Sequence, residues 1–111
     1  MQFVNLTPHE ITIFADGDAT SSLVVPRSGQ IARMSSATQT VHNDWGFPVV
    51  RTTFGAVEGL PDPKEGVALI VSGMVLDAMK ASGVYRDDLF APGQLLRDAS
   101  GAPMGCIGLR K

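Results

Sequence analysis

The chain has 111 residues, 44% of them hydrophobic and 18% charged, and a net charge of -2. A chain of this length can bury one core without disulfide or metal staples, so we expect a single globular domain over residues 1–111. Nine basic residues, never three together, argue against a nucleic-acid groove, and a charge of -2 is too small for a mimic of DNA.

No pattern for targeting or membrane insertion is present. The first residues lack the basic and apolar regions of a signal peptide. The longest nearly apolar stretch, residues 67–76, is about half a membrane span. The one cysteine, Cys106, lies in an apolar run that predicts a buried, inert thiol. We therefore expect no membrane contact and a cytoplasmic location.

Short strands are predicted through the first half of the chain. Runs rich in β-branched and aromatic residues, separated by glycine and proline, are typical of strands joined by turns. We expect strands at residues 3–6, 11–14, 23–25, 31–34 and 49–54. Residues 35–40 are small and polar and are predicted to be a mobile connection. Pro26 marks 23–25 as an edge strand, where a second copy could pair to form a homo-oligomer.

The second half predicts a buried strand, a helix and a hairpin. Residues 67–71 are apolar on both faces and are expected to form the central strand. Helical spacing of apolar residues after Ser72 predicts one α-helix at about 74–82. Residues 94–97 and 104–109 predict a hairpin with its turn at 98–101. The predicted fold is α+β: a compact, mainly antiparallel or mixed sheet, with a partial barrel as one form, and one helix on a face.

Two places could hold a small anionic ligand. Ser72 and Gly73 follow a buried strand and begin a helix, where free amides and the helix dipole favour an anion. Arg51 and Thr53 lie on one face of a strand, and the guanidinium suits a carboxylate or phosphate. The structural alternatives are an ordinary strand-to-helix joint and an exposed arginine.

His9 stands in the segment Thr-Pro-His-Glu, which has the spacing of a capping box. The simpler interpretation is a tight turn between two strands. The functional one is an imidazole held at a rigid corner, able to donate a hydrogen bond to a ligand or to carry a proton.

Trp45 lies in a predicted turn at 42–46, and Phe47 directly after it adds to an apolar patch. Such a turn suits contact with a protein partner, although a rim or core role fits Trp45 equally well.

Common catalytic motifs are absent from the sequence, including the serine-hydrolase, β-lactamase and zinc-protease signatures. One cysteine and two separated histidines make a poor metal set. We therefore assign no catalytic residue, metal or cofactor. The alternative is a small hydrolase or nucleotide-processing enzyme with His9 as general base.

Several short motifs in a fixed order carry a resemblance that spans most of the chain. They are Asn-Leu-Thr-Pro-His at 5–9, Arg-Thr-Thr-Phe-Gly at 51–55, Ile-Val-Ser at 70–72, Arg-Asp-Asp-Leu at 86–89, Pro-Gly at 92–93 and Arg-Asp at 97–98. In these the chain resembles small uncharacterised proteins of bacteriophages, prophages and bacterial genomes. The resemblance implies a stand-alone product of a phage or mobile element and supplies no catalytic residue.

The functional hypothesis is a non-catalytic binder or inhibitor in the host cytoplasm, including a role in counter-defence. In one mode it sequesters a nucleotide-like anion with His9, Arg51, Thr53, Ser72 and Gly73. In the other it blocks a host protein through Trp45 and Phe47. A minor virion or assembly protein is a third hypothesis.

Overall fold

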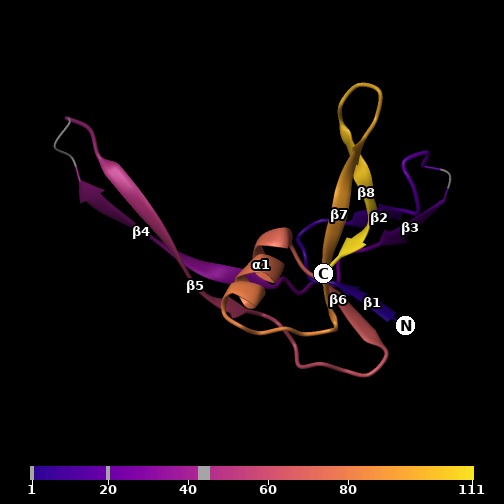
Figure 1. Cartoon of the computed structure of the whole chain (residues 1–111), viewed down its shortest axis with the longest axis horizontal. Helices are drawn as coiled ribbons and strands as arrows, with labels where there is room; N and C mark the ends of the chain where they lie inside the picture. The colour runs from indigo at the N-terminus through magenta and orange to yellow at the C-terminus, as the bar shows by residue number, and fades with distance from the viewer. Residues whose placement is uncertain (1, 20, 43–45) are drawn as a thin grey trace.

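The computed structural model describes residues 2–19, 21–42 and 46–111 (Figure 1). Within these residues the chain is mainly β, with one helix. The elements in chain order are β1 (Gln2–Asn5), β2 (Ile11–Phe14), β3 (Ser22–Val25), β4 (Arg33–His42), β5 (Val49–Glu58), β6 (Val67–Ile70), α1 (Gly73–Ala81), β7 (Leu89–Arg97) and β8 (Pro103–Arg110).

Six strands form one mixed sheet in the order β1-β6-β7-β8-β2-β3. The pairs β1/β6, β6/β7 and β2/β8 are parallel, whereas β2/β3 and β7/β8 are antiparallel. The two ends of this order meet, because Asn5 at the end of β1 bridges Arg27 just after β3. The Ser28 amide also donates to the Asn5 carbonyl at 3.1 Å. The sheet is therefore a nearly closed barrel, which confirms the predicted mixed sheet and partial barrel.

The helix α1 covers the part of the barrel that contains β6 and β7. Val75 and Leu76 are its buried residues, as the apolar spacing predicts. They pack in a core cluster with strand and loop residues, namely Leu6, Ala32, Leu69, Val71, Leu89 and Ala91.

Both ends of α1 are capped. The Ser72 hydroxyl accepts from the Val75 amide at 3.3 Å, which fixes the first turn. Gly83 has φ of 84°, and the amides of Gly83 and Val84 donate to Lys80 and Met79 at 3.0 Å each. This paired arrangement is a Schellman motif, and the helix ends just before this glycine.

Strands β4 and β5 form a separate antiparallel two-stranded sheet. Figure 1 shows this hairpin standing out from the rest of the molecule, and we call it the arm. The radius of gyration is 17.1 Å, against about 13 Å for a compact chain of this length. The rest of the described chain is called the body.

The arm accounts for the main errors of the sequence prediction. Residues 35–40, predicted to be a mobile connection, lie inside β4, and the strand expected at 31–34 begins only at Arg33. β4 is exposed on both faces, so its side chains show no alternation to detect. The molecule is accordingly less compact and richer in β structure than a balanced α+β fold. The strand expected at 67–71 is β6, which lies between β1 and β7 but is second in the order of six strands and not at its centre.

Candidate functional site

The segment Asn-Leu-Thr-Pro-His at 5–9 forms the corner between β1 and β2. The buried Asn5 amide donates to the His9 carbonyl at 2.8 Å and to the Val25 carbonyl at 3.1 Å. Its side-chain oxygen accepts from the Thr7 amide at 2.9 Å and from the Thr7 hydroxyl at 2.6 Å. One asparagine thus ties the corner to β3 and helps to close the barrel.

His9 is exposed at this corner. Its hydrogen bonds to Asn5 and Thr7 run through the backbone carbonyl and amide. The predicted turn between two strands is confirmed. Within the motif, the side chains that hold this turn are those of Asn5 and Thr7.

Ser72 and Gly73 lie at the start of α1, next to the guanidinium of Arg110. A Cβ added to Gly73 would lie 2.8 Å from a terminal guanidinium nitrogen of Arg110. The same guanidinium donates to the Asp77 carboxylate at 3.2 and 3.3 Å, and this hydrogen bond lowers the pKa of Asp77. An anion at the helix start would therefore compete with the Asp77 carboxylate for the Arg110 guanidinium.

Arg51 and Thr53 lie on one face of β5, opposite Gln39 and Ala37 of β4. Arg51 is six residues from Val57, the part of β5 that packs against the core cluster. At the rise of a strand this places Arg51 about 20 Å out along the arm. The structure does not bring Arg51 and Thr53 to the helix start, so the five anion-binding candidates do not form one site.

Two hollows of the body have the size for a small ligand. A cavity of about 300 Å³ beside β2, β7 and β8 includes Glu10 and Cys106 in its lining. Its one charged lining residue, Glu10, is acidic and does not suit an anion. Burial raises the pKa of the Cys106 thiol, which keeps it protonated, as predicted for an inert cysteine.

A second groove, of about 370 Å³, lies beside the corner and includes Arg27, Thr7 and Ser28. The Ser28 hydroxyl donates to the Gln30 carbonyl at 3.3 Å, and the Thr7 hydroxyl belongs to the corner. The two hydroxyl groups in the lining of this groove are thus hydrogen-bonded within their own loops.

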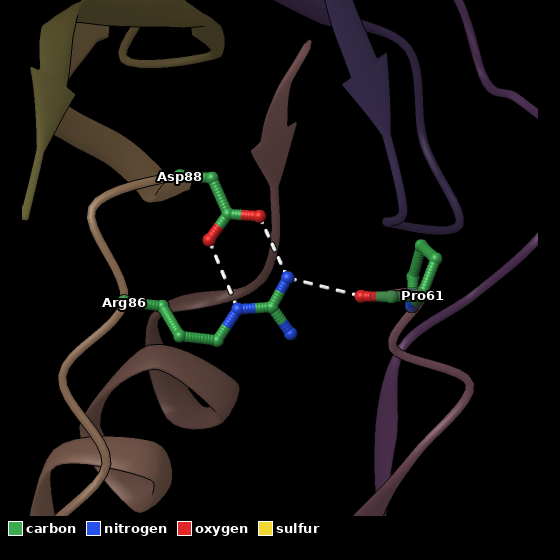
Figure 2. Close-up of polar contacts among 3 residues, drawn as sticks. All are labelled: Pro61, Arg86 and Asp88. Atoms are coloured by element: carbon green, nitrogen blue, oxygen red, sulfur yellow. Dashed lines mark hydrogen bonds and ion pairs between the residues drawn. The ribbon is translucent and has the colours of Figure 1, made fainter. Parts of the chain in front are cut away.

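Arg86 and Asp88 form an ion pair in the segment after the helix. The Arg86 side chain donates to both carboxylate oxygens at 2.9 and 2.6 Å and to the Pro61 carbonyl at 3.0 Å (Figure 2). The two side chains are only 16% and 14% exposed, so this pair is better shielded from water than a typical surface pair. It ties the loop after β5 to the body and serves the fold.

The arm carries the apolar side chains that sequence reasoning only partly found. Trp45 lies outside the described residues, and Phe47, in the turn before β5, is 58% exposed. Further along β5, Val50 and Phe54 are 58% and 57% exposed. Strand alternation in 49–54 was the signal for these two, because it places Val50, Thr52 and Phe54 on one face.

Cross-strand register completes that face of the arm. Phe54, Thr52 and Val50 lie opposite Ser36, Thr38 and Thr40 of β4. We call these six residues the Phe54 face. It carries no charged side chain. The exposed Val50 and Phe54 side chains are surrounded on this face by serine and threonine.

The described residues contain no group of three or more His, Cys, Asp or Glu that could hold a metal ion. Within the same residues, no helix has the length and apolarity needed to cross a membrane. Comparison of the chain with protein-family models, curated proteins and solved structures found no match.

Proposed function

We propose that the chain is a non-catalytic binding protein and that the arm is the surface with which it contacts another protein. The observation that carries this proposal is the exposure of Val50 and Phe54 on a two-stranded ribbon outside the body. An isolated two-stranded hairpin is only marginally stable in water. Contact with a partner would cover the apolar groups and give the ribbon the support it lacks.

The resemblance to phage and prophage proteins favours a host protein as target, in the host cytoplasm, and inhibition of that protein as the result. Counter-defence is one form of such inhibition. Sequestration of a nucleotide-like ligand has less support, since Arg51 and Thr53 lie on the arm and Ser72 and Gly73 on the body. The enzymatic alternative has no particular support from His9, which is exposed and bonded through its backbone.

A capture experiment tests the proposal. Tagged wild-type protein, Phe54→Thr and Leu95→Thr are each mixed with lysate of a bacterial host. Leu95 is the matched control, because it is a 49% exposed apolar residue on β7 of the body. We expect proteins captured by the wild type and by Leu95→Thr to be lost from Phe54→Thr, while all three proteins melt at similar temperatures. Equal capture by all three would remove the arm as the binding surface.

A further inference from the structure

Among the residues that the structure describes, strand β5 has a long open edge. It pairs with β4 on one side, and its residues 50–56 are exposed. Proteins usually protect such edges with charged side chains, proline or bulges. Between residues 49 and 54 the one charged residue is Arg51.

The ladder of β4 and β5 is irregular at both ends of this segment. Phe54 lies opposite Ser36 and Val57 opposite Met34, so Gly55 and Ala56 share one position of the ladder. That arrangement is a β-bulge. At the other end Val50 lies opposite Thr40 and Val49 opposite His42, so Val41 is an extra residue of β4. Residues 50–54 are therefore the regular and weakly protected part of this edge.

We infer that a second copy of this chain pairs antiparallel with this edge, about a twofold axis at Thr52. The inference rests on the proposed function and names one partner of the arm. Residues directly opposite in an antiparallel pair point to the same face of the sheet. A twofold axis through a residue satisfies this condition, since it matches each position with one an even number of residues away.

Among the possible axes, Thr52 uses the regular segment best. It places Val50 opposite Phe54 of the second copy, Thr52 opposite its own counterpart, and Arg51 opposite Thr53. An axis at Arg51 would place two guanidinium groups directly opposite, which is unfavourable. Axes at Thr53 or Phe54 would run the pairing into the bulge.

The resulting pairs are of the kinds that stabilise sheets. An aromatic residue beside a β-branched one, and threonine beside threonine, are favourable cross-strand neighbours. The corresponding regular segment of β4, residues 36–40, has the sequence Ser-Ala-Thr-Gln-Thr and offers no large apolar pair. The edge of β5 is therefore the one that suits a second copy.

Pairing would also convert two ribbons into one sheet in the order β4-β5-β5-β4. Three or more strands with an apolar face are the requirement for independent stability, which a single hairpin does not meet. The Phe54 faces of the two copies would become continuous, with both Val50 and both Phe54 side chains along the seam. Because the strands run in opposite directions, the two bodies would lie at opposite ends of the shared sheet.

Cysteine cross-linking tests the axis directly. Thr52→Cys faces itself across the axis at a cross-strand distance that a disulfide can bridge with small adjustment. With oxidised glutathione as oxidant, we expect Thr52→Cys to give far more covalent dimer than Thr53→Cys, which would face Arg51. The wild type is the blank, because its Cys106 is buried.

The register has its own test. Val50→Cys mixed with Phe54→Cys is expected to give a mixed dimer in several-fold higher yield than either variant alone. Sedimentation of the wild type should show dimer growing with protein concentration, and Phe54→Thr should shift that growth to higher concentration. Equal dimer from Thr52→Cys and Thr53→Cys, or a wild type that stays monomeric up to millimolar concentration, would overturn the inference.

These results separate the inference from the proposed function. If no variant cross-links but Phe54→Thr still loses captured host proteins, the arm binds other proteins and the dimer is wrong. If Thr52→Cys cross-links and capture is unaffected by Phe54→Thr, the dimer stands and the host-binding role of the arm falls.

Discussion

The body and the arm use β-strands in opposite ways. In the body, strands close on themselves, Asn5 satisfies the corner, and every buried side-chain nitrogen or oxygen among the described residues has a hydrogen-bond partner. In the arm, strands of ten residues are held by one ladder and leave Val50 and Phe54 in water. The difference indicates that the body is stable through its own packing, whereas we expect the arm to gain stability when another protein binds to it. Four predictions test this contrast.

The largest expected effect is in the core of the body. Leu89 is 1% exposed within the core cluster. Leu89→Ala should lower the free energy of unfolding by about 2–5 kcal/mol, because it leaves a cavity that neighbouring side chains cannot fill. Phe54→Ala, on the arm, should change it by less than about 0.5 kcal/mol. Urea denaturation of both variants measures this difference, and equal losses would contradict the contrast between the two regions.

The corner should show a similar contrast over a few residues. Asn5→Ala removes the donor to two carbonyls and the acceptor for Thr7, leaving buried polar groups unsatisfied. We expect a loss of about 3 kcal/mol in thermal or urea unfolding. His9→Ala is the control, and it should be nearly neutral because that side chain is exposed. A large loss from His9→Ala together with little from Asn5→Ala would reverse our assignment of the motif.

A smaller effect is expected where the loop after β5 joins the body. Arg86→Ala removes a bidentate ion pair and the bond to Pro61. The expected loss is about 1–2 kcal/mol, since the pair is only partly shielded from water. Arg86→Lys should recover part of it, because an ammonium keeps the charge but lacks the planar fork. Unfolding curves of the two variants decide this, and identical curves would show that the geometry of the fork is unimportant.

The smallest expected effect is a pH dependence at the helix. Arg110 lowers the pKa of Asp77 below its ordinary value of 3.8. A carboxylate with a lowered folded-state pKa contributes stability that is present above the unfolded pKa and is lost as the pH falls through the folded one. Wild type should therefore lose stability below about pH 4 more steeply than Asp77→Asn. Parallel pH profiles of melting temperature for the two proteins would show that the exposed pair contributes nothing.

How far the sequence predicts each region follows from the same contrast. Body elements were found where burial leaves a pattern: strand 11–14 has the predicted bounds, and the helix expected at about 74–82 spans Gly73–Ala81. The strand expected at 94–97 is the end of β7, which begins at Leu89 and includes Pro92 and Gly93. A Cβ on Gly93 would fall 2.2 Å from the Ile107 carbonyl oxygen. Gly93 is needed because the backbone of β8 passes close to it, and local sequence does not reveal this contact.

The arm was harder to predict because neither of its strands is buried. Ser36, Thr38 and Thr40 are polar on a face that the body does not cover, so hydropathy alone does not separate them from a loop. The prediction of one anion site was wrong for a related reason. Arg51 was joined with Ser72 because both suit an anion, but only the direction in which the hairpin leaves the body sets their separation.

The order in which strands join the barrel has a consequence for folding. β2 pairs with β8 through Ile13 and Cys106, and β1 pairs with β6 through Gln2 and Val67, so partners are far apart in the chain. Topologies dominated by such distant contacts fold slowly. The arm joins neighbours in sequence and can form early by local zippering. During synthesis the arm, with its exposed apolar residues, would thus leave the ribosome before β8 is made and the barrel can close. Aggregation through the arm at this stage is the hazard of this topology.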